Sequence, residues 1–231
     1  MAVRQIPLAI VPAPAMSLDS FVPGPSVANA AVLAHLRAMP MRSGAPVYLW
    51  GASGSGKTHL LQALTASWLA QGRRAAWFDA TTALPWTLEE QTSLIVLDGA
   101  EQLNATQQHA GFALFIETAA AGVQWAAAGA LPPVDLPLRD DLRTRLAWGH
   151  VFALEALGES DARAVLRREA DRRGIFLSDE VMGYLLTRYS RDLKHLMALL
   201  DRLDEFSLSE QRAITVPLLK RMFDEEGADL V

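Results

Sequence analysis

Apolar residues between positions 47 and 154 form short runs of the kind that make buried strands. The runs are Val47–Trp50, Ala75–Phe78, Leu94–Leu97, Val123–Ala128 and Val151–Leu154. The stretches between them are expected to be helical, as from Leu60 to Leu69, where apolar residues recur at helical spacing until Gly72. Strands that alternate with helices predict an α/β fold with a parallel sheet covered by helices on both faces. Ligands of such sheets bind beyond the carboxyl ends of the strands.

The pattern changes beyond Leu157, where no further strand is predicted. Helix starts are expected at Ser160–Asp161, Ser178–Asp179, Ser190 and Thr215, because each is followed by apolar residues at i, i+3 and i+4. Four helices then make a small helical domain. The predicted organisation is an extended arm (1–15), an α/β domain (16–157) and a small helical domain (158–231).

Prolines set the character of the amino-terminal segment. Five of them occur among the first 25 residues, a composition that opposes both helix and sheet and predicts an extended chain. A helix is expected to follow from Ser26 and to stop at Pro40.

Composition narrows the class of protein. The 231 residues are 51% hydrophobic and 20% charged, which predicts a globular chain with one or two cores. A formal net charge of −5 argues against broad, non-specific nucleic-acid binding. The chain has no cysteine, which excludes disulfides, thiolate metal sites and cysteine nucleophiles and favours a reducing, cytoplasmic setting. No apolar stretch reaches 18 residues and the amino terminus does not resemble a signal peptide, so no membrane association is expected.

A phosphate-binding motif lies between the first predicted strand and the helix after it. Its residues are Gly51, Ala52, Ser53, Gly54, Ser55, Gly56, Lys57 and Thr58, which fit G-x-x-x-x-G-K-[ST]. Backbone N–H groups, the helix N-terminus and Lys57 would bind phosphates, and Thr58 would bind Mg²⁺. The alternative is a glycine-rich turn without a ligand, but a chance match in a chain of this size has odds of roughly one in a hundred. The motif and its context predict a nucleotide, ADP or ATP, with Mg²⁺.

Asp98 is the second candidate metal ligand. It ends a predicted strand, where a carboxylate can hold Mg²⁺ beside the phosphates; alone, it would more simply be a turn or cap residue. Many ATPases place another carboxylate next in sequence, to orient the attacking water, but here that residue is Gly99. Glu101 is a candidate substitute. The simpler interpretation is a protein that holds nucleotide and hydrolyses it poorly.

The order of phosphate loop, Asp98 strand, arginine-bearing segment and helical domain resembles the AAA+ ATPases. Within them the chain is similar to the DnaA-related proteins, namely the initiator DnaA and its short homologues, the Hda regulators. The similar stretches are Asp19–Gly24, Val47–Gly51, Leu131–Pro133, Leu142–Gly149 and Thr215–Pro217. Initiators carry a helical insert that Ala80–Ser93 is too short to form, and a helix-turn-helix domain that this sequence lacks. The resemblance therefore favours the regulators.

This resemblance implies roles for two arginines. Arg145 matches the arginine that AAA+ proteins project into a neighbouring subunit's nucleotide site, with Arg143 as the rival candidate and a surface ion pair to Asp140 or Asp141 as the alternative for either. Arg191 matches the lid arginine that contacts the protein's own nucleotide. The polar residue that the family carries near the end of the fourth strand is missing, which makes turnover by this chain doubtful.

The arm has a resemblance of its own. The hexapeptide that begins at Gln5 is similar to the peptide by which Hda proteins bind the DNA polymerase sliding clamp, with Gln5 as a polar contact and Ile6, Leu8 and Ile10 as apolar anchors. The implied function is negative regulation of replication initiation: an ADP-bound protein docks on the clamp (β subunit) and stimulates hydrolysis of DnaA-bound ATP. No direct sequence-specific nucleic-acid contact is expected, and assembly into homo-oligomers stays open. The alternative function is a free-standing AAA+ ATPase, such as a helicase loader or a DNA-remodelling helper.

Overall fold

The computed structural model describes residues 17–39, 44–119, 121–188, 193–210 and 212–225. The chain divides into two compact units, an α/β unit that extends to Ala156 and a helical unit that begins at Leu157. The arm that carries Gln5, Ile6, Leu8 and Ile10 lies outside the described residues, as does Arg191.

A five-stranded parallel sheet forms the centre of the α/β unit. Its strands are β1 (Val47–Trp50), β2 (Arg74–Phe78), β3 (Thr92–Leu97), β4 (Gln124–Gly129) and β5 (His150–Ala153), in the spatial order β2-β3-β4-β1-β5. Trp50 pairs with Gly129 and Leu97 pairs with Ala127, so the carboxyl ends of the three central strands lie at one edge. The predicted α/β fold with a parallel sheet is confirmed.

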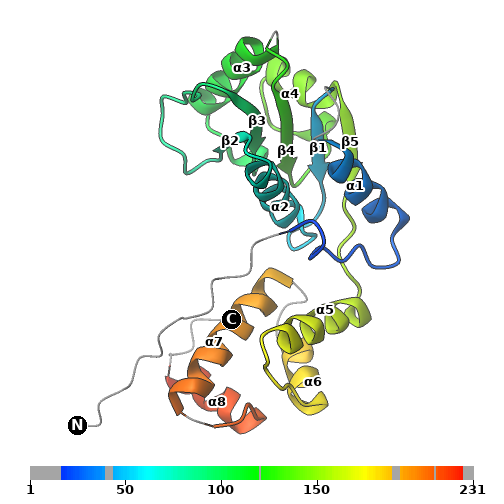
Figure 1. The fold of residues 1–231 in the computed structure, drawn as a ribbon, viewed down its shortest axis with the longest axis vertical. Helices are drawn as coiled ribbons and strands as arrows, with labels where there is room; N and C mark the ends of the chain where they lie inside the picture. The colour runs from blue at the N-terminus through cyan, green and yellow to red at the C-terminus, as the bar shows by residue number, and fades with distance from the viewer. Residues whose placement is uncertain (1–16, 40–43, 120, 189–192, 211, 226–231) are drawn as a thin grey trace, which may run out of the picture. The chain divides into compact units, whose positions relative to one another are not determined.

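Helices cover both faces of this sheet (Figure 1). Helices α1 (Val27–Ala38) and α2 (Lys57–Ala70) pack on one face, and α3 (Ala105–Ala119) and α4 (Asp140–Ala147) pack on the other. Alternate residues of each strand point to opposite faces. Leu49 therefore joins the α1/α2 core, whereas its neighbour Tyr48 joins the α3/α4 core.

Helix α1 begins where the sequence predicts. The Ser26 side chain accepts a hydrogen bond from the Asn29 N–H at 3.2 Å, which satisfies one of the free donors of the first turn. Asn29 is buried and exchanges hydrogen bonds with the backbone of Glu155, at 3.0 Å in each direction. The start of α1 is thereby tied to the segment that follows the last strand.

The helical unit consists, within its described residues, of α5 (Glu159–Arg172), α6 (Asp179–Arg188), α7 (Leu193–Glu210) and α8 (Val216–Glu225) around one apolar core. Ser178 and Thr215 accept hydrogen bonds from the first turns of α6 and α8. The predicted cap at Ser160–Asp161 is wrong. Helix α5 begins at Glu159, and its N-cap Gly158 has no side chain to contribute.

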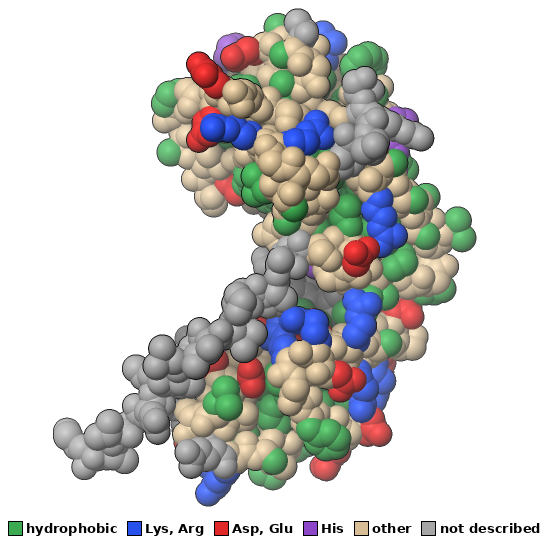
Figure 2. All heavy atoms as spheres, in the orientation of Figure 1, with side chains coloured by type: hydrophobic (Ala, Val, Ile, Leu, Met, Phe, Trp, Pro, Cys, Tyr) green, Lys and Arg blue, Asp and Glu red, His purple; other side chains and the backbone are tan. Residues whose placement is uncertain are grey.

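No helix among the described residues is long and apolar enough to cross a membrane. The same residues contain no group of three or more His, Cys, Asp or Glu side chains arranged to hold a metal ion. On the face of the helical unit seen in Figure 2, Lys/Arg and Asp/Glu side chains lie close to one another. Several arginines of the helical unit form ion pairs, as Arg167 does with Asp179 at 2.5 Å.

Candidate functional site

The predicted phosphate loop connects the carboxyl end of β1 to the first turn of α2. Gly56 is the N-cap of α2 with φ at 95°, a conformation that side chains with a Cβ rarely adopt. A Cβ on Gly51 would collide with the carbonyl oxygen of Leu154. Glycine is therefore required at both ends of the loop for the chain to turn back over the start of the helix.

Ser55 is the buried polar residue of this loop. It is 6% exposed, and among the described residues its hydroxyl has no hydrogen-bond partner. A buried polar group left unsatisfied costs about 1–3 kcal/mol. The hydroxyl can donate to a phosphate oxygen, so this orphaned atom fits a loop that binds an anion.

Lys57 supplies the positive charge of the loop. Its ammonium donates hydrogen bonds to the carbonyl oxygens of Gly51 at 2.7 Å and Ala52 at 2.8 Å. These contacts hold the side chain back along the loop, close to the N-terminus of α2. The ammonium and the free N–H groups of the first turn make this end of the helix attractive to an anion.

The two predicted metal ligands meet at the edge of the sheet. Thr58 Oγ1 donates to the Asp98 carboxylate at 2.8 Å, although 40 residues separate them in sequence. Burial raises the pKa of Asp98 above its ordinary value, while hydrogen bonds from Thr58 and the Gly99 N–H and the charge of Lys57 act in the opposite direction. A cation placed here would stabilise the ionised carboxylate. A hydroxyl and a carboxylate are the ligands expected for Mg²⁺ beside phosphates.

The carboxylate of Glu101, the candidate substitute base, already has a hydrogen-bond partner. It accepts a hydrogen bond from the Ala130 N–H, just after β4, at 3.0 Å. Gly99 adopts the left-handed conformation, with φ at 66°, and starts the short 3₁₀ helix η2 (Ala100–Gln102). The geometry directs the Glu101 side chain toward the end of β4.

The amino-terminal segment contacts the phosphate loop, a contact that the sequence did not predict. A Cβ added to Gly56 would lie 2.8 Å from the ring of Phe21, so this ring covers the loop where α2 begins. Nearby, Ser20 Oγ lies 3.0 Å from Nε2 of His59, in the first turn of α2. Both Ser20 and Phe21 belong to the stretch Asp19–Gly24, whose similarity to DnaA-related proteins was the available signal.

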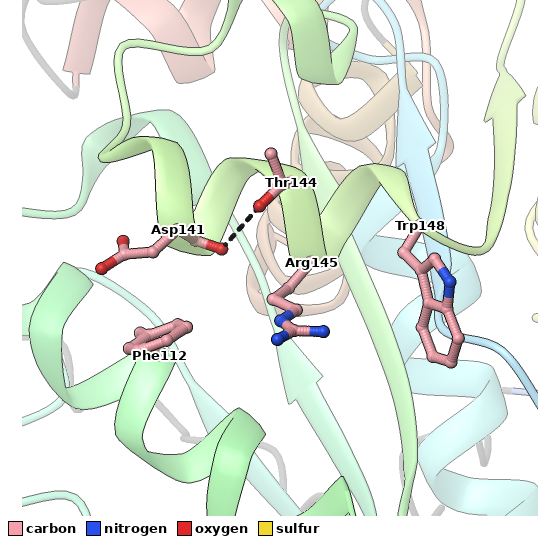
Figure 3. A pocket seen from close by; sticks show the side chains of 5 residues that line it. All are labelled: Phe112, Asp141, Thr144, Arg145 and Trp148. Carbon is pink, nitrogen blue, oxygen red and sulfur yellow. Dashed lines mark hydrogen bonds between the residues drawn. The ribbon is translucent and has the colours of Figure 1, made fainter.

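Arg145 lies on α4, away from the phosphate loop in sequence. It lines a hollow of about 390 Å³ together with Phe112, Asp141, Thr144 and Trp148. Figure 3 shows its guanidinium directed into the space between Phe112 and Trp148. Trp148 is 69% exposed, and within the described part of the chain no carboxylate forms an ion pair with Arg145.

The rival candidate Arg143 differs in this respect. Its guanidinium pairs with Asp140 at 2.5 Å, and Asp141 pairs with Arg139 at 2.7 Å. The surface ion pair considered for either arginine is thus formed by Arg143. Arg145 forms no such pair within the described residues, and its guanidinium lies 5.9 Å from the centroid of the Phe115 ring.

Comparison with known proteins assigns the chain to a family. A family model described as "Hda, lid domain" matches residues 159–223, and one for the bacterial DnaA ATPase domain matches residues 13–80. An uncharacterized protein of Haemophilus influenzae is 36% identical over 187 residues, which are 77% of this chain and 80% of that protein. This chain is an Hda-like member of the DnaA-related AAA+ family. The predicted resemblance is confirmed.

Solved structures share the AAA+ fold of this Hda-like protein. Domain III of the replication initiation protein DnaA from Thermotoga maritima has a TM-score of 0.75 at 19% identity, over 92% of this chain and 97% of that one. AMPPCP-bound DnaA from Aquifex aeolicus has a TM-score of 0.68 at 19% identity, over 93% and 70%. The Thermotoga maritima RuvB Holliday junction branch migration motor has a TM-score of 0.66 at 16% identity, over 91% and 72%.

Proposed function

We propose that this protein binds an adenine nucleotide, with ADP as its resident ligand, together with Mg²⁺ at the loop Gly51–Thr58. The orphaned hydroxyl of Ser55 and the contact between Thr58 and Asp98 support this proposal. A DnaA of the same fold has been solved with AMPPCP bound. Arg191, outside the described residues, is the proposed further phosphate contact that the family resemblance implies.

Each side chain of the loop has a distinct part in this binding. The N–H groups around Gly54–Gly56 and the first turn of α2 donate to phosphate oxygens, and Ser55 adds a hydroxyl donor. Lys57 moves from the carbonyls of Gly51 and Ala52 to the phosphates, where charge-assisted hydrogen bonds are stronger than bonds to neutral carbonyls. Thr58 and Asp98 would hold the metal ion, which would neutralise phosphate charge.

Retention of the nucleotide, rather than its turnover, is proposed as the role of this site. Gly99 has no side chain to orient a water molecule, and the Glu101 carboxylate is bonded to the Ala130 N–H. A general base must lie within hydrogen-bond reach of the proton it abstracts. The bound nucleotide therefore serves chiefly to stabilise the active form of the protein.

We further propose that the protein is a negative regulator of replication initiation that stimulates hydrolysis of DnaA-bound ATP. Arg145 would extend into the nucleotide site of DnaA and neutralise charge that develops on the transferred phosphoryl group. An arginine supplied in trans accelerates phosphoryl transfer roughly 10³- to 10⁵-fold. Residues Gln5, Ile6, Leu8 and Ile10 would tether the protein to the sliding clamp, and an extended arm reduces the entropy lost on binding.

One observation carries the assignment of the arginine: Arg145 is exposed and has no ion pair among the described residues, whereas Arg143 is paired with Asp140. The test measures ATP hydrolysis by DnaA in the presence of clamp loaded on DNA. Arg145→Ala is expected to abolish the stimulation, and Arg143→Ala, its matched control, to retain most of it. Stimulation that survives Arg145→Ala would remove the proposed mechanism.

Two further measurements test the rest of the proposal. Gln5→Ala is expected to lower stimulation when the clamp is limiting, and an unchanged response would remove the tether. The purified protein alone is expected to turn over ATP very slowly. Steady hydrolysis that Lys57→Ala abolishes would instead favour the free-standing ATPase.

A further inference from the structure

The connection from β4 to α4 is held at its start by the segment that follows Asp98, and at its end by Gln108 of α3, which also bonds to that segment. This connection runs from Ala130 to Arg139 and leads directly into the helix that carries Arg145. The segment that holds it, Gly99–Leu103, begins at the residue next to the candidate metal ligand. The two regions are far apart in sequence but adjoin in the α/β unit.

The start of the connection is fixed by Glu101 and Tyr48. Glu101 accepts a hydrogen bond from the Ala130 N–H at 3.0 Å, and the hydroxyl of Tyr48 donates to the Leu131 carbonyl at 2.9 Å. Both side chains occupy the space beside Gly129, where a Cβ would lie 2.8 Å from the Glu101 carboxylate and closer still to the Tyr48 hydroxyl. A larger residue at the end of β4 would displace both contacts.

The end of the connection is fixed by Gln108 of α3. Its amide donates to the Leu103 carbonyl at 2.8 Å, and its side-chain oxygen accepts from the Arg139 N–H at 3.0 Å. Arg139 is the N-cap of α4. Gln108 is 9% exposed, so the bridge from Leu103 to the start of α4 is largely shielded from competing water.

Between these hydrogen bonds, apolar residues of both segments are buried in one cluster with residues of the strands, α3 and α4. Leu136 and Leu138 of the connection belong to the buried cluster that also contains Ala100 and Leu103. Other residues of the connection are exposed, such as Val134 at 78%. The start of α4 is held from α3 as well, because Nη1 of Arg139 lies 2.8 Å from Nδ1 of His109.

We propose that Glu101 and Gln108 are positioning residues that couple the protein's own nucleotide site to Arg145. Mg²⁺-nucleotide held by Thr58 and Asp98 would restrict the segment Asp98–Leu103, and Glu101 and Gln108 would transmit that restriction to both ends of the connection before α4. The protein with nucleotide bound then presents Arg145 in a narrower range of positions than the empty protein. This inference rests on the proposed nucleotide binding and deepens it by assigning the ligand a regulatory effect.

The test is hydrogen–deuterium exchange of residues 140–148 in the full chain, with and without Mg²⁺-ADP, because coupling has to be shown by a response at the distant site. In the wild-type protein the ligand is expected to slow exchange in α4 about tenfold, and in Glu101→Ala by less than about twofold. Glu101→Gln keeps an acceptor for the Ala130 N–H and is expected to restore the response. Glu117→Ala, which changes an exposed carboxylate of α3, is the matched control.

Binding of a fluorescent ADP, measured on the same samples, separates the outcomes. Equal slowing of exchange in wild type and Glu101→Ala, with ADP bound to both, overturns the coupling and leaves nucleotide binding intact. Failure of the wild type to bind ADP overturns both. Normal coupling without any stimulation of DnaA would contradict only the proposed partner.

Discussion

Thr58 donates a 2.8 Å hydrogen bond to the carboxylate of Asp98, which joins the first turn of α2 to the end of β3. Neither residue is unusual by itself in sequence. Together they place a hydroxyl and a partly buried carboxylate at the edge of the sheet where β1 also ends. Without a cation, burial disfavours the ionised form of the Asp98 carboxylate. Asp98 is therefore expected to lower the stability of the ligand-free protein while it supplies a metal ligand.

Replacement of that carboxylate is expected to have opposite effects on stability and on ligand binding. Burial raises the pKa of Asp98, so the folded state holds a proton more readily than the unfolded state, and its stability falls as pH rises past the ordinary carboxyl range. Asp98→Asn should remove this part of the pH dependence in the nucleotide-free protein and weaken Mg²⁺-dependent nucleotide binding. Urea unfolding at several pH values from 3 to 8, without nucleotide, checks the first effect, with Asp135→Asn as control. A variant whose pH dependence matched wild type would contradict it.

Removal of the loop ammonium should lower nucleotide affinity. Lys57→Ala loses charge-assisted hydrogen bonds worth about 1.5–3 kcal/mol, which corresponds to a Kd roughly 10- to 150-fold higher. Titration with a fluorescent ADP measures this change. Lys220→Ala removes a lysine of α8 in the helical unit and is expected to bind as wild type does. Equal affinity of both variants would show that the loop does not bind phosphate through Lys57.

Gly129→Ala is expected to destabilise the end of β4. The added methyl group would collide with the Tyr48 hydroxyl and approach the Glu101 carboxylate, and overpacking of this kind typically costs about 1–3 kcal/mol. Tyr48→Phe removes the hydroxyl and should recover part of the loss in the double variant. Chemical denaturation of the two single variants and the double variant gives their interaction energy. Gly44→Ala has open space around the new methyl group and serves as control; additive losses would contradict the proposed collision.

The helical unit should lose stability in acid through Glu169. Hydrogen bonds from Arg172 at 2.5 Å and Arg173 at 2.7 Å lower the pKa of Glu169 to about 2 from its ordinary 4.5. Because the folded pKa is depressed, this stabilisation is complete above pH 4.5 and declines as pH falls toward 2. Glu169→Gln should cost about 1–3 kcal/mol at pH 7 and progressively less between pH 5 and pH 3. Urea unfolding across this range, with the exposed Glu180→Gln as control, tests the trend; a cost independent of pH would contradict it.

The local sequence was sufficient to predict the strands and helices and to identify the residues of the phosphate loop. Parallel strands are buried on both faces, which is why they are apolar throughout in Val47–Trp50 and Leu94–Leu97. Such runs can be recognised from the sequence. The loop depends on glycines at fixed spacing before Lys57, which is also a local property. The start of α5 was predicted wrongly because both Ser160 and Gly158 can occupy the N-cap position. Backbone geometry, which the sequence does not show, decides between them.

Contacts between distant segments were decided only by the tertiary structure. The sequence indicated Thr58 and Asp98 separately, and the strand order brought them within hydrogen-bond distance. It named Arg143 and Arg145 as rivals, and only the pairing of Arg143 with Asp140 on the surface of α4 separates them. The bridges from Glu101 to Ala130 and from Leu103 through Gln108 to Arg139 had no sequence signal. Spacing along the chain specifies local conformation, whereas which side chains meet depends on how the strands are ordered and how the helices pack against them.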